Sequence, residues 1–161
     1  AEAGGCLEVS GDHAAPVRPD ACAGGTVIEV RDLFFNTPAR RKFLRAAATE
    51  FGHISELIAR MALVHHRVAF RLQHHDRVTL DLPAEPARDR RVLAVLGKEL
   101  DEGLLRFEQE AAPGGGGDGL RVWGMAGLPA LARATAKFQY LCVNGRPIRD
   151  RNLAHAIREA Y

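Results

Sequence analysis

Two prolines separated by only two residues, Pro83 and Pro86, interrupt every periodic pattern near the middle of this 161-residue chain. Proline lacks a backbone N–H and disfavours helical conformation in the residue before it, so this segment is predicted to form a stiff, extended connector. The connector, residues 84–87, is predicted to join two domain parts, residues 1–83 and residues 88–161. Pieces of roughly 80 residues bury little surface, so both are expected to be incomplete domains.

The composition, 47% hydrophobic and 26% charged, is typical of a globular protein. No apolar run approaches the roughly 20 residues of a membrane-spanning helix, and residues 1–10 do not resemble a secretory signal. The chain does not start with Met, which suggests that the sequence begins within a longer protein. Three widely spaced cysteines without a CxxC pair favour reduced thiols in a cytosolic protein over a metal or redox site; they are Cys6, Cys22 and Cys142.

Hydrophobic periodicity predicts strands and helices mixed along the first part. A helix is expected from Pro38, capped by Thr37, with Phe43 and Leu44 facing inward and the cations facing outward. A second helix is expected after it, capped by Thr49. Residues 11–25 are predicted to be a loop, and strands are predicted at residues 6–10, 26–31, 68–73 and 78–82, the last two joined by a turn at residues 74–77.

The second part is predicted to start with an amphipathic helix at residues 88–100. Strands are expected at residues 104–110, 120–125 and 137–143, with a glycine-rich hairpin loop at residues 113–119. The Asn144–Gly145 pair is the strongest short signal for a tight hairpin turn. A last helix is expected to begin at Asp150 or Asn152.

Several patterns that could indicate a catalytic or metal site have a simpler explanation. The glycine run at residues 114–119 leads into a strand and lacks the Lys and Ser/Thr of a phosphate-binding loop. The pairs His65–His66 and His74–His75 have no carboxylate at ligand-like spacing, so solvent-facing histidines are the better explanation. No nucleophile motif is present. We therefore predict no catalytic residue and no metal ligand within the chain.

Two stretches carry clustered cations on predicted supports. GGTVIEVRDLFFNTPARRKFL, residues 24–44, places four cations near a helix that starts with proline, and YLCVNGRPIRDR, residues 140–151, presents three arginines on a hairpin. Arginines held in this way suit contacts with phosphate through charge and forked hydrogen bonds. From chemistry alone, phosphate binding is as good an interpretation of these arginines as surface cations or structural salt bridges.

These same stretches resemble the MutL family of DNA mismatch repair proteins. GTVIEVRDLFFNTPARRKFLR is similar to the family's signature segment, TEFGHISELIARMAL to the helix after it, and VNGRPIRDRNLAHAIREAY to its VNGR segment. The resemblance runs with gaps from about residue 25 to residue 161 and is looser over residues 84–133. It implies an α+β fold: the C-terminal part of a gyrase/Hsp90-type ATPase α/β sandwich, followed by the first part of a ribosomal-protein-like transducer domain.

The resemblance implies a role in DNA mismatch repair, as an ATP-dependent matchmaker that couples mismatch recognition to strand nicking and excision. The full-length protein is expected to be a weak ATPase that binds ATP and Mg, whereas this fragment alone is expected to bind neither well and to hydrolyse nothing. Expected partners are DNA, a second copy in an ATP-dependent dimer, a mismatch-recognition protein, and downstream nicking and unwinding enzymes. The expected location is the cytoplasm, in association with the bacterial nucleoid.

By the same resemblance, Gly25 and Thr26 fall on the last nucleotide-site motif and are expected to make a peripheral ATP contact. DNA contacts are expected first from the hairpin and second from the basic helix, for which a structural role stays open. The predicted DNA-binding residues are Arg146, Arg149, Arg151, Arg40, Arg41 and Lys42. The alternatives are a non-catalytic RNA-binding module, disfavoured by the 6% aromatic content and the first motif, and another ATPase of the same superfamily.

Overall fold

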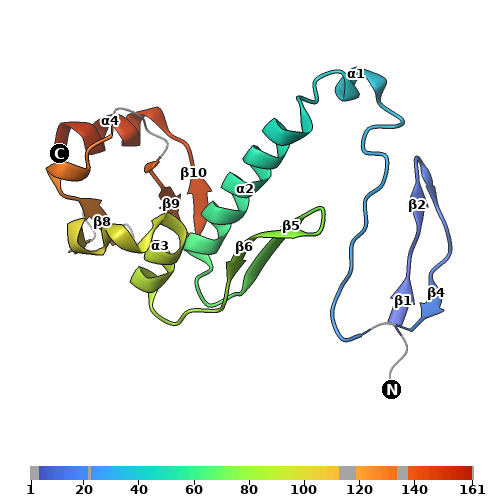
Figure 1. Cartoon of the computed structure of the whole chain (residues 1–161), viewed down its shortest axis with the longest axis horizontal. Helices are drawn as coiled ribbons and strands as arrows, with labels where there is room; N and C mark the ends of the chain where they lie inside the picture. The colour runs from blue at the N-terminus through green and yellow to red at the C-terminus, as the bar shows by residue number, and fades with distance from the viewer. Residues whose placement is uncertain (1–3, 22, 113–118, 134–137, 161) are drawn as a thin grey trace. The chain divides into compact units, whose positions relative to one another are not determined.

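The computed structural model describes residues 4–21, 23–112, 119–133 and 138–160 (Figure 1). The chain divides into two compact units, Ala1–Glu50 and Phe51–Tyr161. The predicted connector at residues 84–87 therefore lies inside the second unit, and the domain boundary predicted there stays a prediction. Each unit is described by itself.

The first unit opens with an irregular antiparallel hairpin. Strand β1 (Gly4–Cys6) pairs with β4 (Arg18–Asp20), and β2 (Val9–Ser10) pairs with β3 (His13–Ala14) around Gly11, whose φ is +62°. The predicted single strand at residues 6–10 is thus split, and the loop predicted at residues 11–25 was wrong in part. Gly11 and Asp12 form only the turn, and the residues after it form strands β3 and β4, which pair with β2 and β1.

The strand predicted at residues 26–31 was wrong, because this segment has no regular secondary structure. Its apolar side chains lie in solvent: Val27 is 91% exposed and Ile28 83% exposed. A strand requires a neighbour that accepts and donates its backbone hydrogen bonds, and none of the described residues pairs with this one. The β-branched residues therefore favour a strand, but no described strand pairs with this segment.

A series of turns leads into the basic segment. The backbone N–H of Phe35 donates to the carbonyl oxygen of Asp32, and that of Thr37 to Phe34, with positive φ at Asp32 and Phe34. Helix α1 (Pro38–Arg41) then begins with proline in its first turn, as predicted, but is a single turn long. Two details were wrong: Thr37 makes no side-chain capping bond, and Phe43 and Leu44 are 84% and 42% exposed instead of packed inward.

Helix α2 (Ala47–Val64) spans the division between the two units. It starts before Thr49, so the predicted cap was wrong: the N–H of Thr49 already donates to the carbonyl of Ala46. Glu50 stabilises the start instead, since its carboxylate accepts the N–H of Arg45 at 2.8 Å. Within the second unit this helix lies beside the hairpin of β5 (Phe70–His74) and β6 (Arg77–Leu82), which confirms the two predicted strands and their turn (Figure 1).

The core of the described residues is small. Only two apolar side chains are buried, Ala62 in α2 and Leu82 at the end of β6. A stacked contact between the rings of Phe51 and His74, with centroids 4.1 Å apart, adds a contact between α2 and the hairpin. Much apolar surface stays exposed, including a stripe of α2 residues: Ile54, Leu57 and Met61.

A buried arginine joins the next helix to this hairpin. Helix α3 (Arg88–Leu96) ends at Gly97, earlier than predicted, and the chain continues as the 3₁₀ helix η1 (Lys98–Gly103). The side chain of Arg91 is 1% exposed. Its Nη2 donates to three backbone carbonyl oxygens, those of His66 at 2.7 Å, Val68 at 2.9 Å and Pro83 at 2.7 Å.

The proline connector is itself bonded on both sides. The N–H of Glu85 donates to the carbonyl of His66 at 2.8 Å, and the carboxylate of Glu85 accepts the N–H of Ala87 at 3.0 Å. The Nδ1 of His66 lies 2.7 Å from the carbonyl oxygen of Glu85. The connector and the turn that follows α2 are therefore one hydrogen-bonded joint, with Arg91 at its centre.

The remainder of the second unit contains a long antiparallel hairpin of β7 (Leu104–Ala111) and β8 (Leu120–Gly127), which confirms both predicted strands. The predicted glycine loop between them falls largely on residues 113–118, outside the described residues. A short 3₁₀ helix, η2 (Pro129–Leu131), follows. A Cβ on Gly103 would lie 2.5 Å from Leu131 Cδ1, so a larger residue there would require the side chain of Leu131 to move.

Candidate nucleic-acid interface

The arginine-bearing hairpin is built on a tight turn. Strand β9 (Leu141–Val143) pairs antiparallel with β10 (Arg146–Ile148), with Val143 opposite Arg146. The two turn residues have positive φ, +47° at Asn144 and +74° at Gly145, the backbone that a two-residue hairpin requires. The predicted turn is therefore confirmed, and it fixes where Arg146 leaves the sheet.

The other end of the hairpin is fixed by a helix cap. Helix α4 (Arg151–Ala160) begins directly after Asp150, whose Oδ1 accepts the N–H of Leu153 at 2.8 Å. This bond satisfies one of the unpaired N–H groups of the first turn, so of the two predicted starts Asp150 is the cap. Arg149 and Arg151 therefore lie on either side of Asp150, whose conformation is fixed by its capping bond.

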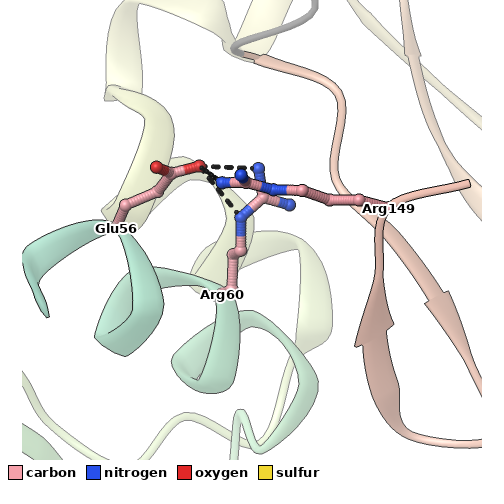
Figure 2. Close-up of polar contacts among 3 residues, drawn as sticks. All are labelled: Glu56, Arg60 and Arg149. Carbon is pink, nitrogen blue, oxygen red and sulfur yellow. Dashed lines mark hydrogen bonds and ion pairs between the residues drawn. The ribbon is translucent and has the colours of Figure 1, made fainter. Parts of the chain in front are cut away.

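Arg149 is bonded to helix α2. Its Nη2 donates to Oε1 of Glu56 at 2.6 Å, and the same oxygen accepts Nε and Nη2 of Arg60 at 3.1 and 2.8 Å. Figure 2 shows the two guanidinium groups converging on this one carboxylate oxygen from α2 and from the chain after β10. The side chain of Arg149 is nevertheless 74% exposed, against 30% for Glu56 and 10% for Arg60.

The surroundings of Glu56, Arg60 and Arg149 explain why the charge of Arg149 stays accessible. Arg60 lies with its guanidinium carbon 4.9 Å from the centroid of the Tyr140 ring, so one face of its fork is covered. The hydrogen bonds from Arg60 and then from Arg149 hold the pKa of Glu56 below its usual range, and the carboxylate is ionised at neutral pH. Burial raises the pKa of both Tyr140 and Cys142, which stay protonated and neutral. Two cations and one anion leave a net positive charge.

The other two predicted cations of the hairpin are placed differently. Arg146 and Arg151 are exposed, and neither forms an ion pair with any residue that the structure describes. The hairpin therefore brings together three exposed arginines within six residues, one bonded to α2 and two accessible. Glu56 and Arg60 were missed by the sequence reasoning, although their spacing of four on a predicted helix is typical of an ion pair.

The predicted site residues of the first unit are exposed. Arg40, Arg41 and Lys42 lie on or next to α1, and within the described ranges none of them forms an ion pair. Gly25 has φ +131°, which disfavours any other residue, and Thr26 beside it is exposed. A DNA contact by the cations and an ATP contact by Gly25 and Thr26 stay predictions.

In the described ranges no three or more His, Cys, Asp and Glu side chains gather in a group able to hold a metal ion. No helix in the same ranges has the length and apolar character required to cross a membrane.

Three comparisons with known proteins agree on the family. A family model described as "DNA mismatch repair protein, C-terminal domain" matches residues 92–161. The MutL proteins of Azotobacter vinelandii and Pseudomonas fluorescens are 52% identical over 153 residues and 48% identical over 159 residues, which cover 93% and 96% of this chain. The alignments cover 23% and 24% of those proteins, so the chain spans about a quarter of their length.

A solved structure is similar throughout the chain. The "Aquifex aeolicus MutL ATPase domain complexed with ADP" superposes with a TM-score of 0.70 at 33% identity, covering 96% of this chain and 57% of that one. The fold is thus the predicted α+β fold, of the gyrase/Hsp90-type ATPase and transducer class. The chain belongs to the MutL family of DNA mismatch repair proteins. The comparisons do not support the alternative of an RNA-binding module.

Proposed function

We propose that this chain is the part of an ATP-dependent mismatch-repair matchmaker that joins its ATPase domain to its transducer domain and supplies part of its DNA-binding surface. The observation that carries the proposal is the β9–β10 hairpin with the start of α4, where Arg146 and Arg151 are exposed and form no ion pair with any described carboxylate. Contacts from such arginines to backbone phosphate position a protein on DNA without reading its sequence.

The start of α4 supports the same surface. The first N–H groups of a helix carry partial positive charge, and Arg151 is the first residue of α4. The carboxylate of Asp150 already accepts one of these N–H groups, so a phosphate near Arg151 would chiefly meet its guanidinium. The cations of α1, Arg40, Arg41 and Lys42, are proposed as a second contact with DNA.

The nucleotide role is proposed for the whole protein. The solved relative contains ADP, and the chain is similar to it over almost its entire length. We infer that the whole protein binds ATP with Mg, and that Gly25 and Thr26 make a peripheral contact to the nucleotide. The domain boundary proposed at residues 84–87 is supported by the family model, whose match begins at residue 92. The chain by itself is expected to show no Mg-dependent ATP hydrolysis.

The proposed partners follow from the family. They are DNA, a second copy of the protein in an ATP-dependent dimer, a mismatch-recognition protein, and the enzymes that nick and unwind the strand. The proposed location is the cytoplasm, at the bacterial nucleoid.

The proposal is tested by charge reversal at Arg151. We expect Arg151→Glu to weaken binding of a fluorescently labelled random-sequence duplex about tenfold, and to lower the slope of log affinity against log salt by roughly one. A duplex of different sequence should lose affinity by the same factor, because phosphate contacts carry no sequence information.

The matched control is Arg77→Glu, the same charge change at an exposed hairpin arginine of the second unit. It should leave affinity and salt slope close to those of the wild type. Equal effects of the two variants would mean that only net charge matters, and unchanged binding by Arg151→Glu would remove the DNA role of the hairpin.

A further inference from the structure

Arg149 differs from its neighbours because a carboxylate holds it before any ligand arrives. The bond from Arg149 Nη2 to Glu56 Oε1, 2.6 Å long, joins residues 93 positions apart in the sequence. It leaves the side chain 74% exposed. A guanidinium has five N–H donors, and this bond occupies one of them, so most of the fork still faces solvent.

We propose that Glu56 is a positioning residue that orients Arg149 for contact with a DNA phosphate, an inference that rests on the DNA-binding role proposed above. Figure 2 shows the geometry: Glu56 and Arg60 come from α2, and Arg149 extends toward them from the end of β10.

The alternative effect of Glu56 would be to compete with phosphate for Arg149. The position of Arg60 argues against competition. Arg60 donates two hydrogen bonds to the same oxygen of Glu56, at 3.1 and 2.8 Å, and is itself only 10% exposed with its face over Tyr140. Arg60 is therefore the cation that offsets the charge of Glu56, and it cannot reach a phosphate in solvent. The charge of Arg149 remains available.

Positioning lowers the entropic cost of binding. A free arginine side chain loses rotamer entropy when it is fixed against a ligand. If Glu56 already restrains Arg149 in the folded protein, part of this entropy is lost before DNA binds. Removing Glu56 should then weaken DNA binding even though it makes the protein more positive, which is the opposite of what electrostatic attraction alone predicts.

The experiment is a double-mutant cycle on the whole protein, with a fluorescently labelled random-sequence duplex as the probe. We expect Glu56→Gln to weaken binding about threefold and Glu56→Ala about fivefold to tenfold, with the salt slope lowered in both. In an Arg149→Ala background, neither change at Glu56 should weaken binding further, because the group that Glu56 positions is absent.

Thermal unfolding of each variant separates this effect from loss of structure. Glu56→Ala leaves the buried Arg60 without its carboxylate, and if that variant does not fold, the isosteric Glu56→Gln decides. Tighter or unchanged binding by Glu56→Gln would overturn the proposal in favour of competition or of a purely structural ion pair. The same weakening in the Arg149→Ala background would also overturn it.

Failure of the DNA-binding proposal gives a different result. If Arg151→Glu leaves DNA binding unchanged, the hairpin is not a DNA surface. If Arg151→Glu weakens binding while the cycle between Glu56 and Arg149 shows no coupling, only the positioning role is wrong.

Discussion

Two arginines of the second unit hold distant segments together in opposite ways. Arg91 is 1% exposed and donates to three backbone carbonyls, whereas the side chain of Arg149 is 74% exposed and donates to one carboxylate. A carbonyl is neutral but polar, and the guanidinium of Arg91 interacts only with carbonyl dipoles inside the protein. Its charge is therefore not accessible to a ligand. Arg149 shares its carboxylate with Arg60 and keeps its charge at the surface. The difference separates an arginine that stabilises a joint from one suited to bind an anion.

The largest expected effect is on stability at the joint. Arg91→Met removes three hydrogen bonds made by a buried, charged donor, so the free energy of unfolding should fall by about 3 kcal/mol or more. Arg149→Met should lower it by under about 1 kcal/mol, because its ion pair is exposed. Chemical denaturation of the two variants measures both values, and similar losses would erase the distinction.

Arg91→Lys sharpens the same point. All three carbonyls are reached by the single atom Nη2, while Nη1 is buried and has no hydrogen-bond partner among the described residues. A lysine ammonium has three donors at one atom, so Arg91→Lys should recover part of the stability that Arg91→Met loses. A lysine variant as unstable as the methionine variant would show that the length of the side chain, and not its donors, decides.

DNA binding should reverse the order of the two arginines. Arg149→Glu is expected to weaken binding to a random-sequence duplex about tenfold and to lower the salt slope by roughly one, since one phosphate contact is replaced by repulsion. Arg91→Lys, tested under conditions in which it is folded, should bind as the wild type does. A fluorescence titration at several salt concentrations gives both readouts, and a loss of affinity confined to the Arg91 variant would break the comparison.

The two sites should also differ in their response to pH. Glu56 has a pKa below its usual range in the folded state, so its ionised form stabilises folding. That contribution is complete above the ordinary titration range of glutamate, roughly pH 4, and is lost as pH falls through the lowered folded pKa. The stability difference between the wild type and Glu56→Gln, about 0.5–1 kcal/mol at neutral pH, should shrink toward zero in acid.

The matched measurement is the difference between the wild type and Arg91→Met over the same pH range. Backbone carbonyls do not titrate, so protonation of the groups that bind Arg91 should not change this stability difference. If acid reduced both differences equally, general acid unfolding would be the cause, and not the protonation of Glu56.

The smallest effect is expected next to Arg91 on the same helix. The guanidinium carbon of Arg88 lies 4.1 Å from the centroid of the Trp123 ring, a half-exposed cation–π contact between α3 and β8. Arg88→Ala should cost about 0.5–1 kcal/mol. Fluorescence of Trp123, the only tryptophan in the sequence, reports the loss directly. A cost as large as that of Arg91→Met would show that the whole face of α3, and not one buried side chain, holds the joint.

The predictions from sequence succeeded where the local chemistry is decisive. Asn144–Gly145 and the turn at residues 74–77 specified two hairpins, and one of the two predicted helix starts, Asp150, caps α4. They failed at residues 26–31 and at Phe43, where a correct local preference has no partner in the described residues. A strand or an inward-facing aromatic needs a second surface, and the pattern of one segment cannot supply it.

The sequence by itself determined the family, through two long motifs in the right order, and the positions of the exposed arginines on their hairpin. Only the tertiary structure distinguished Arg91 from Arg149, since both are arginines in mixed polar and apolar surroundings along the chain. Their roles depend on acceptors far away in sequence, the carbonyls after α2 for one and Glu56 for the other. The physical reason is that a guanidinium takes its function from the groups that fill its hydrogen bonds, and folding alone decides which groups those are.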